Sequence, residues 1–341
     1  MLREALRKAA SGETLSEGEA DRALETIMEG TVPPAATAAL LTALRVRGES
    51  VSEIVGFARA MRRFAARVEA PEGVVDTCGT GGDAKGTINV STAAAFVARG
   101  AGVVVAKHGN RAATSRAGSA DVLEALRAEI ELGPDQVSRC IKESGIGFMF
   151  ARTHHPAMKF VAPVRAELPF RTIFNLLGPL TNPAGAKRQL VGVFAGEYVR
   201  PVAEALRGLG AEKALVVHGT DGMDEITVTQ KTLVAEVGDD RIEEYEISPE
   251  DFGLNLHAPD GLLGGDAHLN ARILRDVLSG EETGAARDVI LLNAGAAIYV
   301  SGEAKTIEEG IRLAGESIGS GAALRALDDF VHTTRRIAGV A

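Results

Sequence analysis

The sequence is short of cysteine, of positive charge and of long apolar runs, and each shortage excludes a class of protein. Its 341 residues include only two cysteines, Cys78 and Cys140, which is typical of a reducing compartment rather than of a disulfide framework. The formal net charge of −9 argues against a nucleic-acid partner, because nonspecific binding to nucleic acid requires a basic face.

Membrane and export signals are also lacking. The longest uncharged apolar run, VILLNAGAAIYV at 289–300, is shorter than the roughly 20 residues that span a bilayer. The first fifteen residues are charged and amphipathic, unlike a signal peptide. We therefore expect a cytoplasmic protein with neither a membrane nor a nucleic-acid partner. A chain of this length exceeds a single core, so two domains are expected.

Residues 1–70 have the pattern of a small helical domain. Ser16 with Glu19 and Ser50 with Glu53 have the S-x-x-E spacing of capping boxes at helix starts. Pro71 then begins a linker. Residues 155–168 also look helical, and we expect the segment 155–180 to pack back against this domain.

Residues 71–341 alternate short β-branched runs with helical patterns. The runs VVD, GVVVAK, IGFMFA, QLVGVFA and ALVVHG predict strands of a mostly parallel central sheet flanked by helices. The stretch 226–248 alternates as β-hairpins do and predicts an antiparallel edge, and helices return from about residue 266. The fold class is therefore α/β, with a small helical N-terminal domain and a large sheet domain.

The segment 76–92, DTCGTGGDAKGTINVST, has the composition of a phosphate-binding loop. Its glycines, Gly79, Gly81, Gly82 and Gly86, permit positive φ and close approach of backbone N–H groups to a ligand. We expect Ser91 or Thr92 to cap the apolar helix that follows, so that an anion would also meet a helix N-terminus. The alternative is an ordinary turn before a capped helix.

Two other phosphate motifs do not fit this segment. Gly79-x-Gly81-x-x-Ala84 is a degenerate dinucleotide fingerprint, but the loop continues at Lys85 where a helix should open. The sequence contains no G-x-x-x-x-G-K-[ST], which excludes a P-loop nucleotide hydrolase.

A second anion site is predicted at 107–121, KHGNRAATSRAGSAD. Lys107, at a strand end, can act as a point charge on phosphate, and Arg111 and Arg116 lie nearby in the sequence. Ser119 and Asp121 begin the helix SADVLEAL, although a plain N-cap would explain them equally. Two anion sites separated by one strand indicate a ligand that is phosphorylated at both ends.

Three further features bear on chemistry. Asp224 and Glu225 follow the strand ALVVH and suit one or two hard cations next to phosphates, although a solvated acidic turn is the alternative. Arg165, on an apolar helix, offers a guanidinium fork for a carboxylate or is an ordinary surface arginine. His108 and Asn110 could line an acceptor pocket, whereas the His154–His155 pair has no matching metal-ligand spacing.

Together these motifs resemble the anthranilate phosphoribosyltransferase family. The resemblance runs through GTGGD at 79–83, NVST at 89–92, KHGN at 107–110, GSADVLEAL at 118–126, NLLGPLTNP at 175–183 and HG-x-x-GMDE at 218–225. It implies transfer of the phosphoribosyl group of 5-phosphoribosyl-1-pyrophosphate (PRPP) to the amino group of anthranilate, a step of tryptophan biosynthesis. It also implies two Mg²⁺ ions per subunit, a phosphoribosyl-binding role for domain 71–341, and a homodimer formed through the helical domain.

The resemblance also implies roles for individual residues. Arg165, Lys107 and His108 would be catalytic, and Ser91, Asp224 and Glu225 would hold magnesium. Arg165 and Asn110 would contact anthranilate, while His108 and Pro179 would line its approach. The remaining substrate contacts would be Gly79, Gly82, Asp83, Thr87, Asn89, Val90, Ser91, Thr92, Lys107, Gly109, Ser115 and Ser119.

The sequence departs from the family pattern in two places. INVST stands where an aromatic FNIST is more usual, and LRAEIELGP lacks the common glycine after the ADVLEAL helix. Two alternatives remain: a pyrimidine nucleoside phosphorylase of the same architecture, and a non-catalytic nucleic-acid-binding relative. The KHGN segment and the acidic pair favour the PRPP enzyme over the first, and the net charge of −9 opposes the second.

Overall fold

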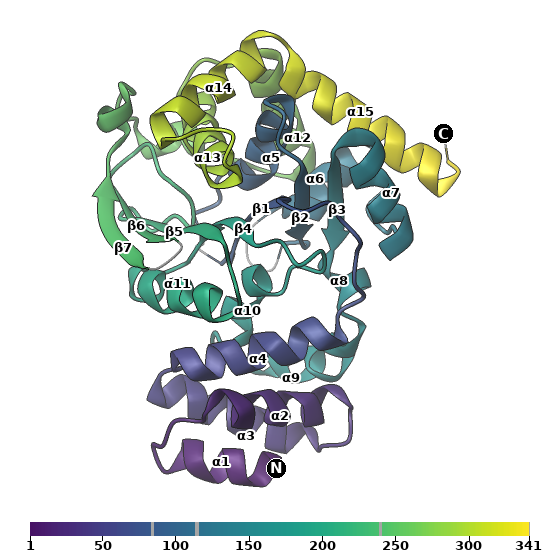
Figure 1. The fold of residues 1–341 in the computed structure, drawn as a ribbon, viewed down its shortest axis with the longest axis vertical. Coiled ribbons are helices and arrows are strands. Elements are labelled where there is room, and N and C mark those ends of the chain that lie inside the picture. Colours follow the sequence, from purple (N-terminus) through teal and green to yellow (C-terminus); the bar gives the residue numbers. More distant parts are fainter. Residues whose placement is uncertain (83–84, 113–115, 239–240, 341) are drawn as a thin grey trace.

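The computed structural model describes residues 1–82, 85–112, 116–238 and 241–340. A group of N-terminal helices lies below a larger α/β part in Figure 1. These helices are α1 (Leu2–Ala10), α2 (Glu17–Met28), α3 (Pro34–Arg47) and α4 (Val51–Phe64). Both expected capping boxes are present, at Ser16 with Glu19 and at Ser50 with Glu53. The fully buried Glu53 carboxylate also pairs with Arg47 and accepts a hydrogen bond from the Leu15 backbone N–H at 2.8 Å, which ties α4 to the start of α2.

The larger part is built on a 7-stranded sheet in the order β3-β2-β1-β4-β5-β6-β7. Its strands are β1 (Val75–Gly79), β2 (Val105–Gly109), β3 (Ile146–Phe150), β4 (Arg188–Gly192), β5 (Lys213–Gly219), β6 (Thr232–Val237) and β7 (Ile242–Ile247). The pairs from β3 to β5 are parallel, while β6 and β7 add in antiparallel orientation. This confirms the expected parallel sheet and its antiparallel edge.

Helices cover both faces of the sheet. In Figure 1, α5, α12, α13 and α14 lie above it, and α10 (Phe174–Leu180) and α11 lie below it. On β5, Leu215 and Val217 pack into a core shared with α5 and α13, whereas Ala214 and Val216 pack into a core shared with α11 and α4. Both faces are therefore buried, as is usual for parallel sheets. The bounds of these helices are α5 (Val90–Gly100), α6 (Ser119–Ala125), α7 (Pro134–Ser144), α11 (Val199–Gly208), α12 (Ala267–Ser279), α13 (Ala285–Ser301), α14 (Ile307–Gly319) and α15 (Ala322–Ala338).

The segment 155–168 is helical as expected, but it is not one continuous helix. The chain forms α8 (Ala151–His154), a 3₁₀ turn η1 (Pro156–Phe160) and the short α9 (Ala162–Glu167). Pro163 has no N–H to donate to the preceding turn, so a continuous helix would lose a hydrogen bond there. Further 3₁₀ turns are η2 (Gly196–Tyr198), η3 (Pro249–Phe252) and η4 (Pro259–Leu262).

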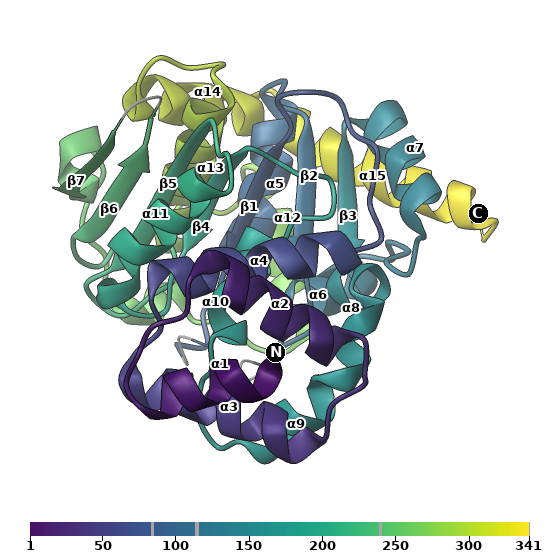
Figure 2. The same ribbon diagram turned by 60° about the horizontal axis from the view of Figure 1, so that its bottom comes forward.

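The segment after β3 returns to the N-terminal helices, as Figure 2 shows for α9 and α10 (Phe174–Leu180). Here η1 contacts α2, α9 contacts α3, and α10 contacts α4. The rings of Phe57 and Phe174 meet edge-on with centroids 6.2 Å apart. The division into domains at residues 70 and 71 stays a prediction. None of the helices in the described ranges combines the length and apolarity needed to cross a lipid bilayer.

Candidate active site

The chemistry-bearing segments meet at one edge of the sheet, where the strands β1, β2, β4 and β5 all end in glycine. Because these strands are parallel, their carboxyl ends lie on the same side, the usual position for a site in an α/β fold. Gly79 and Gly192 lie side by side in the β1–β4 register.

The acidic loop after β5 rests directly on these glycines. A Cβ atom on Gly79 would lie 2.2 Å from Oδ2 of Asp224, and one on Gly192 would lie 1.5 Å from the Asp224 carbonyl oxygen. Only backbone without side chains permits this approach. Sequence reasoning anticipated Gly79 but missed Gly192, whose partner is distant in the chain.

The two adjacent carboxylates reach different partners. Oδ2 of Asp224 accepts a hydrogen bond from the Gly81 N–H at 2.7 Å, and Oε1 of Glu225 accepts one from the Ser91 N–H at 3.3 Å. The acidic pair therefore joins the glycine loop to the start of α5. An ordinary solvated turn would not make these contacts.

Two polar side chains, the partly buried Asp221 and the fully buried Asn293, hold the acidic loop in place. Asp221 accepts hydrogen bonds from the Thr227 hydroxyl at 2.6 Å and the Met223 N–H at 3.0 Å. Asn293, on α13, binds both backbone groups of Ile226: its Oδ1 accepts from the N–H at 3.0 Å and its Nδ2 donates to the carbonyl at 2.8 Å. Neither Asp221 nor Asn293 carried a signal in the sequence.

Within the described ranges, no group of three or more His, Cys, Asp or Glu side chains is arranged to hold a metal ion. The donor set here is two carboxylates with the Ser91 hydroxyl nearby. That set fits magnesium, which keeps most of its ligands as water or substrate phosphate and takes few protein carboxylates.

Three of the four glycines of the loop have the positive φ that was expected, and Gly79 does not. Gly81, Gly82 and Gly86 have φ of +68°, +78° and +66°, in the left-handed region that favours glycine. On its far side the loop forms a bridge between Thr87 and Leu263.

The helix after the loop begins earlier than expected. Asn89, and not Ser91 or Thr92, is the N-cap of α5, and its side chain makes no cap hydrogen bond. Val90, Ser91 and Thr92 therefore form the first turn, where backbone N–H groups lack intrahelical acceptors. The Thr92 hydroxyl is buried and has no hydrogen-bond partner among the described residues. A ligand oxygen at this helix start would find donors already aimed at it.

Lys107 is buried, not exposed at the strand end as a point charge would be. Its Nζ donates to the Thr77 carbonyl oxygen and lies 3.3 Å from the Ser91 hydroxyl. Burial lowers the pKa of Lys107, and the negative charge of the nearby Asp76 opposes that shift. Burial likewise raises the pKa of Asp76, although Lys107 and a 2.7 Å hydrogen bond from Asn182 favour its charged form.

The loop after β2 is braced internally. The Asn110 carbonyl oxygen accepts a hydrogen bond from the Ser119 hydroxyl at 3.2 Å, which closes the segment onto the start of α6. Arg111 is less available to a ligand than expected, because its guanidinium pairs with Asp121 at 2.9 Å and with Glu124. Lys107, within β2, is instead the basic residue of the segment 107–121 that contacts the Ser91 end of α5.

Helix α10 joins His108 to Arg165. The His108 ring lies with Nδ1 3.1 Å from the Gly178 carbonyl oxygen, and burial holds its pKa well below the usual value. Its Nε2 has no hydrogen-bond partner in the described part of the chain. One turn earlier on α10 is Phe174. The guanidinium carbon of Arg165 lies over the Phe174 ring, 5.6 Å from the ring centroid.

Arg165 has the environment expected of a residue that binds an anion. Burial lowers the pKa of its guanidinium, and no salt bridge to it is found within the described ranges. Pro179 is buried on the same helix as Phe174, where its carbonyl oxygen accepts a hydrogen bond from Gln189 at 2.8 Å.

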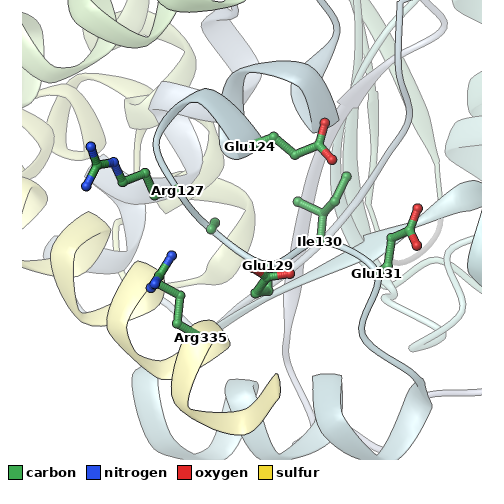
Figure 3. A pocket seen from close by; sticks show the side chains of 7 residues that line it. Glu124, Arg127, Glu129, Ile130, Glu131 and Arg335 are labelled. Atoms are coloured by element: carbon green, nitrogen blue, oxygen red, sulfur yellow. The ribbon is translucent and has the colours of Figure 1, made fainter. Parts of the chain in front are cut away.

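A surface hollow of about 610 Å³ lies beside α15 and the end of α6 (Figure 3). Its lining side chains carry charges of both signs, from Arg127 and Arg335 and from three glutamates. Arg127 has φ of +70°, at the place where the sequence lacks the usual glycine. This hollow contains none of the predicted site residues.

The comparisons with known proteins agree along the whole chain. A family profile described as "Glycosyl transferase family, a/b domain" matches residues 71–324, and one described as "Glycosyl transferase family, helical bundle domain" matches residues 3–65. The sequence is 84% identical over 339 residues, 99% of each chain, to an anthranilate phosphoribosyltransferase of Rubrobacter xylanophilus. The chain belongs to the anthranilate phosphoribosyltransferase family.

Solved structures of the anthranilate phosphoribosyltransferase family have the same fold. The enzyme of Thermus thermophilus superposes with a TM-score of 0.93 at 49% identity, covering 97% of this chain and 99% of that one. The Saccharomyces cerevisiae enzyme, in complex with PRPP and Mg, superposes with a TM-score of 0.90 at 30% identity, covering 98% of each chain. The yeast enzyme has also been solved with 4-fluoroanthranilate. The family assignment, the enzyme class and the α/β fold with its helical N-terminal part are thus confirmed.

The individual ligand contacts of this anthranilate phosphoribosyltransferase family member stay predictions. The structure gathers Gly79, Ser91, Lys107, Asp224 and Glu225 through the contacts above, and α10 connects His108 to Arg165. Asp83 and Ser115 lie outside the described residues.

Proposed function

We propose that this chain transfers the phosphoribosyl group of PRPP to the amino group of anthranilate, giving N-(5-phosphoribosyl)anthranilate and pyrophosphate. One observation carries the proposal: the acidic pair Asp224–Glu225 is hydrogen-bonded to the glycine loop and to the first turn of α5. Carboxylates beside backbone N–H groups suit a magnesium–phosphate ligand, because the carboxylates would hold the cation while the N–H groups donate to phosphate. The ligands named for the yeast relative, PRPP with Mg and 4-fluoroanthranilate, support the same substrates here.

Magnesium would be held by Asp224, Glu225 and Ser91, with two ions per subunit, and would supply the charge that stabilises pyrophosphate as it leaves. The chain's own donors act on the same leaving group. These are the N–H groups at Gly79, Gly82 and the start of α5. Asp83 and Thr87, from the same loop, would also contact PRPP. Fixed donors of this kind are most effective where charge develops in the transition state.

The rest of PRPP would be held between the two loops. Asn89, Val90, Ser91 and Thr92 come from one side, and Lys107, Gly109, Ser115 and Ser119 from the other. Loss of pyrophosphate gives the ribose oxocarbenium character, as in glycosyl transfer generally. No covalent nucleophile is required.

Anthranilate would bind with its carboxylate on Arg165 and beside Asn110, along a path lined by His108 and Pro179. Its aromatic amine is already neutral near pH 7, so the protein needs to orient it rather than deprotonate it. His108 is suited to a neutral lining role, since burial keeps its pKa well below the usual value. We further propose a cytoplasmic enzyme that dimerises through the N-terminal helices, where Val46 on α3 exposes 82% of its surface.

Arg165→Ala tests the anthranilate end of the site. A charge-assisted hydrogen bond contributes about 1.5–3 kcal/mol, so the KM for anthranilate should rise roughly 10- to 150-fold. The KM for PRPP should change little, and Arg165→Lys should recover only part of the loss, because lysine has no planar fork. Arg152→Ala, an exposed arginine on α8, is the matched control. Equal weakening toward both substrates would refute the assignment.

Asp224→Asn and Glu225→Gln test the metal end. Each keeps the side-chain shape and removes one negative charge, so half-maximal activity should need much more magnesium, by about tenfold or more. Asp260→Asn removes an exposed carboxylate of η4 and should leave the magnesium dependence unchanged. An unaltered magnesium titration in both site variants would exclude this metal site.

A further inference from the structure

Behind the two loops lies a buried asparagine that the predicted site does not include. Asn270, near the start of α12, is 2% exposed. Its Oδ1 accepts a hydrogen bond from the Gly265 N–H at 2.7 Å, and its Nδ2 donates to Oδ1 of Asn89 at 2.8 Å. Asn89 in turn donates through Nδ2 to the Ala117 carbonyl oxygen at 3.1 Å.

These contacts form a relay with only one self-consistent direction. The backbone N–H of Gly265 can only donate, and the backbone carbonyl of Ala117 can only accept. The first condition makes Oδ1 of Asn270 an acceptor and its Nδ2 a donor. Asn89 must then present Oδ1 to Asn270 and Nδ2 to Ala117, so both amide orientations are fixed by the backbone at the two ends.

The relay connects three segments that are far apart in the sequence. Asn89 ends the glycine loop and caps α5, while Ala117 precedes α6 at the end of the second anion loop. The segment before α12 is itself tied to the glycine loop, because the Gly264 N–H donates to the Gly86 carbonyl oxygen at 2.9 Å and the Ile88 N–H to that of Leu262 at 3.0 Å. A Cβ on Gly264 would lie 2.6 Å from Oδ1 of Asn270, so the packing there is close.

We propose that Asn270 is a positioning residue that fixes the separation between the two phosphate-binding loops through Asn89. The inference rests on the proposed function, in which PRPP carries phosphate at both ends. A double-ended ligand gains from both loops only if their spacing is preset, since the second contact is then effectively intramolecular. A ligand with one anionic end needs no such spacing.

Asn270→Asp separates this role from a structural one. The carboxylate still accepts from the Gly265 N–H but cannot donate to Asn89, so the relay breaks while the segment before α12 keeps its anchor. The KM for PRPP should rise about tenfold, the size expected for one lost hydrogen bond with a buried oxygen left unpaired. The KM for anthranilate and the inhibition constants for pyrophosphate and for ribose 5-phosphate should each change far less.

The controls separate the possible outcomes. Asn255→Asp makes the same change at an exposed asparagine and should match wild type. In the double variant Asn89→Ala/Asn270→Asp, the KM for PRPP should equal that of Asn89→Ala alone, because Asn270 acts through Asn89. If Asn270→Asp does not fold, Asn270→Ala serves in its place with the same expected discrimination.

An unchanged KM for PRPP, or equal weakening toward PRPP, pyrophosphate and ribose 5-phosphate, would overturn the relay. Additive effects in the double variant would do the same. Failure of the proposed function is distinguishable, because wild-type protein would then consume no anthranilate in the presence of PRPP and Mg²⁺.

Discussion

Replacing Gly192 with alanine perturbs the acidic loop without substituting any residue that is proposed to bind magnesium or substrate. The added Cβ would lie 1.5 Å from the Asp224 carbonyl oxygen and 2.4 Å from its carbonyl carbon. Carbon atoms in contact are separated by about 3.5–4.0 Å, so the Asp224 backbone must retreat by roughly 2 Å. Gly192 does not have a positive φ, so the β4 backbone itself accepts alanine and the strain falls on the neighbouring loop.

The displacement bears on both stability and catalysis. Overpacking of this kind typically costs about 1–3 kcal/mol of unfolding free energy, which leaves most domains folded. Because a misplacement of about 1 Å can cost 100-fold in rate, kcat/KM for PRPP should fall at least about 100-fold. Half-maximal activity should also require more magnesium, since Asp224 moves away from the Gly81 N–H.

The assay is steady-state kinetics at several magnesium concentrations, with thermal unfolding of the same preparations. Gly315→Ala is a suitable control, because its added Cβ would meet nothing within 4 Å on α14. A folded Gly192→Ala enzyme with wild-type kcat/KM and magnesium dependence would refute the argument that the bare glycine backbone sets the position of Asp224.

Two further predictions concern stability. Arg127→Gly should raise the unfolding free energy by about 1 kcal/mol, because an L-residue in the left-handed region is strained. Arg127→Ala keeps this strain, so its unfolding free energy should not rise. Equal increases for the two variants in urea unfolding would contradict the prediction. Burial, with the neighbouring His154 charge, lowers the pKa of His155 to about 4 against a small opposing effect of a Thr181 backbone hydrogen bond. The unfolded chain therefore binds this proton below about pH 6.5 while the folded chain stays neutral, so stability is full above that pH and is lost as pH falls toward 4. Urea unfolding at pH 7.5 and 5 should show a smaller acid loss for His155→Gln than for wild type, and identical losses would count against the buried neutral form.

The local features of the fold were readable from the sequence. Capping boxes at Ser16 and Ser50 involve residues three apart, so spacing alone locates them. The strand runs and the positive φ of Gly81 and Gly82 were likewise predictable from residue type. Pro163 is also a local signal: it lies in the first turn of α9, where a missing N–H is tolerated, and so indicates the new helix start that divides the helical segment 155–168.

What the sequence could not supply was long-range contact. Gly192 matters because Asp224 approaches it, and Asn270 because Asn89 lies 181 positions earlier in the chain. Lys107 was expected at a strand end, but it lies in the middle of β2, and its burial against Thr77 depends on neighbouring strands. Arg111 has the composition of a phosphate ligand, yet carboxylates on α6 engage it. Such partners follow from the packing of distant segments and have no local pattern.

The most direct test of the central claim follows the reaction itself. Purified protein is mixed with anthranilate, PRPP and Mg²⁺, and the loss of anthranilate fluorescence is recorded together with the release of pyrophosphate. We predict that fluorescence is lost only when PRPP and Mg²⁺ are both present, with one pyrophosphate released for each anthranilate consumed. Folded protein that leaves the fluorescence unchanged, or that instead cleaves a pyrimidine nucleoside with inorganic phosphate, would contradict the account.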